Sequence, residues 1–170
     1  MRRILQLVWI ILIIGCSKDK DSVPTGNSLN QDSTFVLQAS MANYTAIQFC
    51  HIAITVSSDS AIQAFSDLIV TEHTDYRQML IALSDSLTLH VADSLNPSHL
   101  ALRNFMITIS GREFDSTFIH NQVLDLESAI SLHQTEISSG GNAQVKAFAT
   151  NYLLEIQEQK IWADSIASNY

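Results

Sequence analysis

The sequence predicts an all-α protein, an antiparallel four-helix bundle with a short extra helix before the third long helix. Apolar residues recur at spacings of three and four over several long stretches, which is the period of an amphipathic helix. Gly and Pro number only 5 and 2, which argues against a turn-rich β-sandwich or barrel. A length of 170 residues fits one domain.

The first long helix is expected to follow a cap at Asp32-Ser33. It carries apolar residues at alternating spacings of four and three: Phe35, Ala39, Ala42, Ala46, Phe49, Ala53 and Val56. Asp59-Ser60 opens the second helix, whose inward residues are Ile62, Phe65, Ile69, Tyr76, Leu80, Leu83 and Leu87. After a loop over 88–97, Ser98 is expected to cap a shorter piece that closes at Ser110-Gly111.

Phe114 is expected to begin the third long helix, and the Ser138-Ser139-Gly140-Gly141-Asn142 run breaks the pattern after it. The last helix again alternates spacings of four and three, with Val145, Ala149, Tyr152, Ile156, Gln159, Ala163 and Ile166. Four segments of roughly 25 residues, each ~37 Å long, are joined by short loops and therefore predict the bundle.

The N-terminus has the pattern of an export signal. Arg2 and Arg3 precede an apolar run over 4–14, which spans only ~16 Å as a helix against a bilayer core of ~30 Å. Gly15-Cys16 resembles the lipobox of bacterial lipoproteins, which implies a signal peptide over 1–15 and a lipid, palmitate included, on Cys16. Residues 16–31 then form the lipidated Cys and a flexible tether, and 32–170 form the bundle domain. An unlipidated secretory signal with an incidental cysteine is the alternative.

Charge and cysteine content exclude several classes of partner and site. Lys and Arg number 9 against 17 Asp and Glu, a formal charge of −8, so the chain has no phosphate-binding footprint and nucleic acid is not expected as a partner. Cys50 is flanked by the apolar Phe49 and Ile52, which favours a buried, unreactive thiol over a reactive site.

Common catalytic and metal-binding motifs are absent from the sequence. Glu-x-x-His, His-Glu-x-x-His, Cys-x-x-Cys and Gly-x-Ser-x-Gly do not occur, and no two histidines are three or four residues apart. His73 lies mid-helix beside Glu72 and between inward residues, which allows a metal ligand, a proton-transfer group or a hydrogen-bonded interfacial histidine. Gln159 occupies an inward position. The other histidines are expected on solvated faces or loops: His51, His90, His99, His120 and His133.

Seven aspartates are followed by serine and then by an apolar residue or threonine. Helix capping explains some of these pairs. The tripeptide also resembles an O-glycosylation motif that some Gram-negative bacteria use on exported proteins. That resemblance implies glycans on serines among Ser22, Ser33, Ser60, Ser86, Ser94, Ser116 and Ser165.

The order of several motifs resembles that of the domain of unknown function 4142, a family of ferritin-like helical proteins often labelled outer-membrane proteins. The resemblance covers about 33–167 and rests on Phe35-Val36, Phe65, Glu72-His73, Ser110-Gly111-Arg112-Glu113-Phe114-Asp115 and Gln122-Val123. It implies inward polar positions that other members fill with Glu or His and that here hold Ala46, His73, Leu126 and Gln159. Only His73 keeps an imidazole, so metal binding becomes the less favoured function. Its candidate ligands are Glu72, His73 and Gln159.

These patterns together predict a lipid-anchored helical bundle of the cell envelope. The lipobox resemblance, with Ser17 after Cys16, implies the outer membrane, at its periplasmic face or the cell surface. We expect an envelope or interaction role without catalysis, no cofactor, and the membrane and an unidentified protein as partners. A ferritin-like metal-binding or redox and stress protein with a degenerate site is the alternative, and a small-ligand binder between helices is a third hypothesis.

Overall fold

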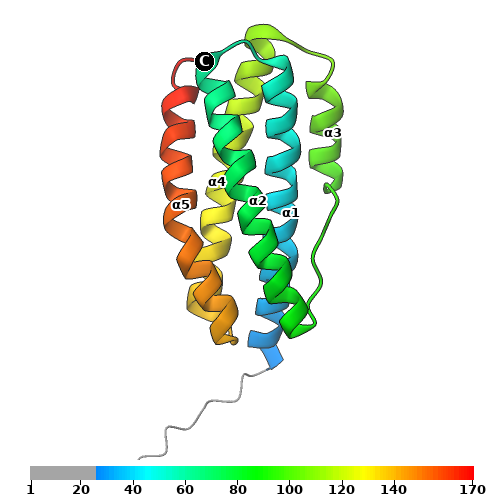
Figure 1. Cartoon of the computed structure of the whole chain (residues 1–170), viewed down its shortest axis with the longest axis vertical. Helices are drawn as coiled ribbons and strands as arrows, with labels where there is room; N and C mark the ends of the chain where they lie inside the picture. The colour runs from blue at the N-terminus through cyan, green and yellow to red at the C-terminus, as the bar shows by residue number, and fades with distance from the viewer. Residues whose placement is uncertain (1–25) are drawn as a thin grey trace, which may run out of the picture.

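The computed structural model describes residues 26–170, and this part of the chain folds into five helices and their connections. They are α1 (Gly26–Val56), α2 (Ser60–Leu87), α3 (Pro97–Met106), α4 (Gly111–Ser139) and α5 (Ala143–Ala167), and this part of the chain contains no strand. The four long helices lie side by side, and α3 flanks them in contact with α4 (Figure 1). α1 packs against α2 and α4, and α5 packs against α4 and α2. The prediction of an all-α helical bundle is confirmed.

Side-chain caps fix where several helices begin. Asp59 Oδ1 accepts hydrogen bonds from the backbone N–H groups of Ala61 at 2.8 Å and Ile62 at 3.0 Å, as the sequence predicted for the start of α2. The predicted cap at Ser98 is wrong. Asn96 caps α3 instead, and Pro97 follows as its first residue, where a missing N–H has no cost.

The predicted start of the first helix, after a cap at Asp32-Ser33, is also wrong. α1 already begins at Gly26, so Asp32 lies inside the helix and does not cap it. Its carboxylate instead accepts hydrogen bonds from the backbone N–H groups of Gly141 at 2.8 Å and Asn142 at 3.0 Å. Asp32 therefore ties the first turns of α1 to the connection between α4 and α5. The predicted signal peptide, Cys16 and Ser22 lie outside the described residues.

Glu136 is buried close to the same connection. Its side chain is 0% exposed, and its Oε1 atom has no hydrogen-bond partner. Burial, together with the nearby Asp32, raises the pKa of Glu136 to about 7. A Cβ atom at Gly140 would lie 2.7 Å from the backbone carbonyl oxygen of Glu136 and would overlap its side chain, so glycine is favoured where the chain leaves α4.

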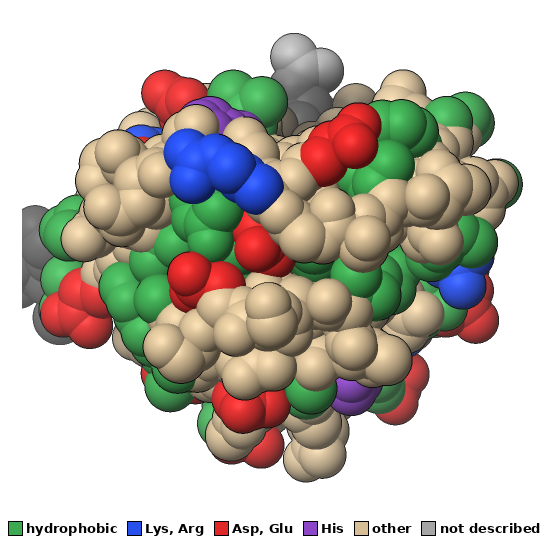
Figure 2. Space-filling view, turned by 90° about the horizontal axis from the view of Figure 1, so that it is seen from above, with side chains coloured by type: hydrophobic (Ala, Val, Ile, Leu, Met, Phe, Trp, Pro, Cys, Tyr) green, Lys and Arg blue, Asp and Glu red, His purple; other side chains and the backbone are tan. Residues whose placement is uncertain are grey.

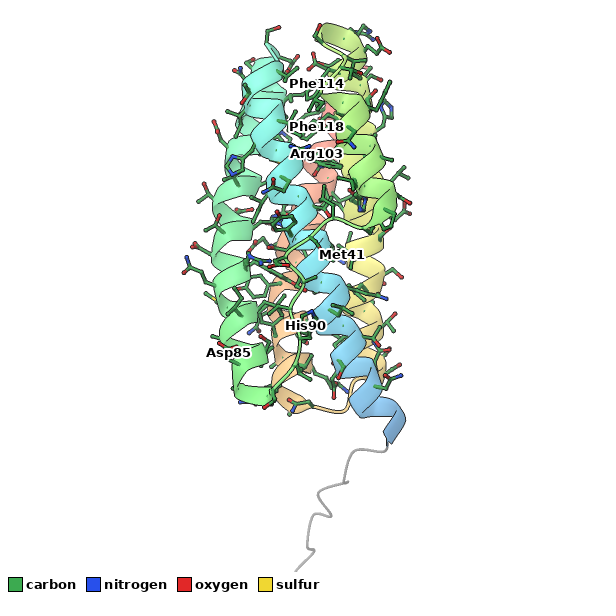
Figure 3. The ribbon with its side chains drawn as sticks, turned by 90° about the vertical axis from the view of Figure 1, so that its right-hand side faces the viewer. Met41, Asp85, His90, Arg103, Phe114 and Phe118 are labelled. Atoms are coloured by element: carbon green, nitrogen blue, oxygen red, sulfur yellow. The ribbon has the colours of Figure 1, made fainter. Side chains whose placement is uncertain are left out.

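Two apolar clusters fill the interior of the bundle. The proximal cluster, near the start of α1, contains Phe35, Val36, Ala39, Tyr76, Leu80, Val145, Phe148 and Ala149. The distal cluster lies toward the other end and includes Phe49, Cys50, Ile62, Phe65, Phe114, Phe118, Leu126 and Ile156, with Phe114 and Phe118 labelled in Figure 3. Cys50 is fully buried as predicted, and burial raises the pKa of its thiol.

The outer surface of the bundle is acidic. Residues 26–170 contain 5 Lys and Arg against 15 Asp and Glu. The end of the bundle that carries the C-terminus shows several acidic side chains around its rim and basic side chains at few places (Figure 2). Among the described helices, none combines the length and hydrophobicity that crossing a membrane requires.

Candidate functional site

Polar side chains gather where the proximal and distal clusters meet. We call them the polar layer: Asn43 on α1, His73 on α2, Gln122 and His133 on α4, and Gln159 on α5. Asn43, Gln122, His133 and Gln159 are each only 2% exposed, and His73 is partly exposed. Because buried polar groups must find hydrogen-bond partners, their partners define what this layer can do.

A hydrogen-bond chain joins the three residues that the sequence singled out. Gln159 Nε2 donates to Glu72 Oε2 at 2.8 Å, since a carboxylate can only accept. Gln159 Oε1 therefore faces His73 Nε2, 3.2 Å away, and must accept its proton. The network thus assigns the His73 proton to Nε2 and leaves Nδ1 as an acceptor. Glu72, His73 and Gln159 do come together, through an amide that links the other two.

A second hydrogen-bond chain contains His133, which the sequence analysis wrongly expected on a solvated face or loop. His133 Nδ1 lies 2.7 Å from the carbonyl oxygen of Ala129 and must donate to it. The Tyr76 hydroxyl then donates to His133 Nε2 at 3.1 Å. The signal for this burial was present in the spacing: His133 follows the inward Leu126 by seven residues, which places both on one face of α4.

Burial sets the charge of both imidazoles. It lowers the pKa of His73, although the hydrogen bond to Gln159 opposes this change. It also lowers the pKa of His133 to about 4, against the opposing hydrogen bond to Ala129. Both rings are therefore neutral at pH 7. Burial raises the pKa of the Tyr76 hydroxyl, so this group stays protonated and able to donate.

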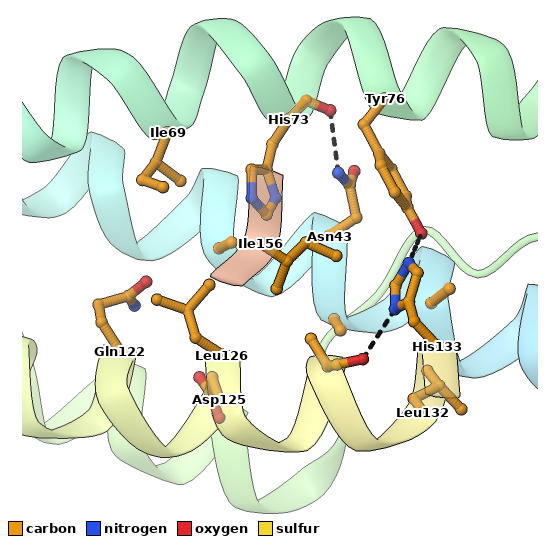
Figure 4. A pocket seen from close by; sticks show the side chains of 14 residues that line it. Asn43, Ile69, His73, Tyr76, Gln122, Asp125, Leu126, Leu132, His133 and Ile156 are labelled. Carbon is orange, nitrogen blue, oxygen red and sulfur yellow. Dashed lines mark hydrogen bonds between the residues drawn. The ribbon is translucent and has the colours of Figure 1, made fainter. Parts of the chain in front are cut away.

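A small cavity of about 40 Å³ lies inside the polar layer (Figure 4). His73, Asn43 and Gln122 line it together with Ala46 and Leu126, the two positions where the family resemblance implied Glu or His. Alanines on α1 and α4 provide the space, because they bring little side-chain volume. Small-molecule sites in proteins enclose ~300–1,000 Å³, so this cavity is too small for an organic substrate.

Another histidine contact anchors α3. His99 Nε2 lies 3.1 Å from Asp125 Oδ1, and this hydrogen bond raises the pKa of His99. Asn121 donates to the other oxygen of Asp125 at 2.7 Å. His99 is therefore less solvated than the sequence suggested, whereas His51, His90 and His120 are exposed as predicted.

The described residues include no group of three or more His, Cys, Asp or Glu side chains placed to hold a metal ion. The Gln159 amide lies between the side chains of Glu72 and His73, and both ring nitrogens of His133 are engaged in hydrogen bonds. Five of the serines proposed as glycan acceptors are exposed, and Ser116 is partly exposed; their modification stays a prediction. The exposed ones are Ser33, Ser60, Ser86, Ser94 and Ser165.

The neutral state of His133 predicts a specific pH dependence of stability. The pKa of histidine is about 6.5 when unfolded and about 4 here, so the unfolded chain binds a proton first as the pH falls. We expect His133→Gln to remove this loss, so that wild type declines relative to the variant by about 2–3 kcal/mol between pH 7 and pH 4. Urea unfolding at both pH values measures it, with the exposed His51→Gln as control. A difference independent of pH would show that His133 is not buried in its neutral form.

Comparison with known proteins places the chain in a family. No curated protein matches it. Among solved structures, the fold is similar to the crystal structure of a DUF305 fragment from Deinococcus radiodurans, with a TM-score of 0.73 over 86% of this chain and 99% of that chain. The identity is 10%, which shows a shared fold alone. The family described as domain of unknown function DUF4142 matches residues 18–166. The chain therefore belongs to the DUF4142 family.

Proposed function

We propose that this protein is a lipid-anchored cell-envelope protein whose helical bundle has a non-catalytic envelope or interaction role. The observation that carries the proposal is that the two interior histidines, His73 and His133, are held in hydrogen bonds within the bundle. His73 Nε2 and Glu72 are joined through Gln159, and His133 is held between Tyr76 and Ala129. Acting on a substrate would require breaking these buried bonds, at a cost of ~1–3 kcal/mol for each group left unpaired.

The anchor is proposed from the sequence before the bundle. Arg2-Arg3, the apolar run and Gly15-Cys16 have the order of a lipoprotein signal. Since α1 begins at Gly26, residues 17–25 separate Cys16 from the bundle and extend ~30 Å at most. A lipid on Cys16 would therefore hold the acidic bundle close to the outer membrane, at its periplasmic face or the cell surface, where it could meet a protein partner.

We also propose that the bundle is ferritin-like, and the directions of its long helices support this. Each long helix runs opposite to the helices it packs against, and α2 and α4 run in the same direction (Figure 1). The segment containing α3 makes the return from the end of α2 to the start of α4. A long crossover between the second and third long helices is the connection found in ferritin-like bundles.

Lipidation is tested by labelling cells of a lipoprotein-processing bacterium with an alkyne analogue of palmitate. The full-length protein should take up the label and enter the detergent phase, whereas Cys16→Ser should lose both properties because its thiol is gone. Cys50→Ser is the matched control and should keep them, since Cys50 is buried inside the bundle. Equal labelling of wild type and Cys16→Ser, or none in wild type, would contradict the anchor.

Metal binding is the second candidate function, and one observation favours it. Gln159 lies within hydrogen-bond distance of both Glu72 and His73, and His73 is a neutral imidazole as a metal ligand must be. A divalent transition metal prefers several imidazole, thiolate or carboxylate ligands, and an amide is a poor substitute. The arrangement therefore supports at most a metal site with fewer strong ligands than such a metal prefers.

Calorimetric titration with Zn²⁺ and Fe²⁺ at neutral pH separates the two functions. We expect no binding in the micromolar range, because His73 Nε2 is already bonded to Gln159 and no second imidazole joins it. His73→Ala should leave the titration unchanged, as should the exposed His51→Ala. Micromolar binding that disappears in His73→Ala and persists in His51→Ala would overturn the non-catalytic proposal in favour of the metal site.

A further inference from the structure

Three polar atoms in the interior have no hydrogen-bond partner and belong to residues that line the same cavity. They are Asn43 Oδ1, His73 Nδ1 and Gln122 Nε2. The side chains of Asn43 and Gln122 are each 2% exposed, so bulk water does not satisfy them. A buried polar group without a partner costs ~1–3 kcal/mol, and three around a single cavity are unusual in a folded protein.

The hydrogen bonds around the cavity fix the role of each atom. Asn43 Nδ2 donates to the carbonyl oxygen of His73 at 2.9 Å, so Asn43 Oδ1 is left as an acceptor. His73 Nδ1 is also an acceptor, because the ring proton lies on Nε2 toward Gln159. Gln122 Nε2 can only donate. The cavity therefore presents two acceptors and one donor, contributed by α1, α2 and α4 (Figure 4).

We propose that this cavity is a binding site for ordered water. Water donates hydrogen bonds to His73 Nδ1 and Asn43 Oδ1 and accepts one from Gln122 Nε2. Because the Gln122 amide lies at the opposite end of the cavity from Asn43 (Figure 4), more than one molecule is needed. The volume of about 40 Å³ exceeds the ~10–15 Å³ that one molecule needs and therefore has room for a second. A metal cation fits worse, since the N–H hydrogens of Gln122 would face it.

The bound water gives the polar layer a connection that the side chains alone lack. It joins α1, α2 and α4 in the interior, and Gln159 extends the network from His73 to α5. It also holds His73 Nδ1 unprotonated, which keeps the proton on Nε2 for Gln159. The inference does not depend on the proposed envelope role.

Water contacts measured by NMR on the ¹⁵N-labelled bundle test the site. We expect rotating-frame cross-peaks between water and the Gln122 side-chain amide, opposite in sign to the diagonal, because a long-lived water contacts it directly. The exposed Gln134 should give none. Tyr76→Phe removes the hydroxyl of another residue that lines the cavity and should leave the Gln122 cross-peak in place. Absence of that cross-peak in wild type would overturn the proposal.

Two further measurements separate a hydrated cavity from a dry one. Ala46→Leu adds side-chain volume at a residue lining the cavity and should abolish the Gln122–water cross-peak; its persistence would place the water elsewhere. Xenon enters dry apolar cavities, so xenon pressure should not shift the methyl signals of Ile69 and Ile156 in wild type. Xenon-dependent shifts there would show an empty cavity and contradict the water site, even if Ala46→Leu fails to fold.

Discussion

The hydrogen-bond chain from Glu72 through Gln159 to His73 is the interaction on which the rest of the interior depends. α2 and α5 pack together less extensively than α4 and α5 or α1 and α2, and this chain joins them across their interface. Its direction is fixed by the carboxylate, which can only accept, so the amide orientation and the imidazole tautomer follow from one another. The acceptor left on His73 Nδ1 then requires a partner in the cavity.

The polar layer also explains how the bundle can be well packed and still contain a cavity. The aromatic side chains concentrate in the two apolar clusters, while alanines and amides occupy the level between them. Apolar burial in the clusters supplies most of the stability, at ~25 cal/mol per Å². The layer between them favours one register of the helices, because a shift would leave buried amides and imidazoles without partners.

Local pattern was enough to predict most of the helices but not the partners of their polar residues. The alternating spacings of apolar residues predicted the long helices, and Asp59 caps α2 as expected. Both signals act within a few residues along the chain. Asp32 looks like a cap in sequence, yet its partners Gly141 and Asn142 are more than 100 residues away. The spacing of His133 from Leu126 indicates an inward face, but it does not identify the partner Tyr76, which lies 57 residues earlier. Such contacts are set by packing, which one sequence does not reveal.

A double-mutant cycle on His73 and Gln159 tests whether the bond between their side chains organises the polar layer. Urea unfolding would compare His73→Leu, Gln159→Leu and the double variant with wild type. We expect each single variant to lose about 1–3 kcal/mol by leaving its partner unpaired, and the double variant to lose at least about 1 kcal/mol less than their sum. Losses that add to within about 0.5 kcal/mol would show that the two side chains are not coupled and that their bond does not organise the polar layer.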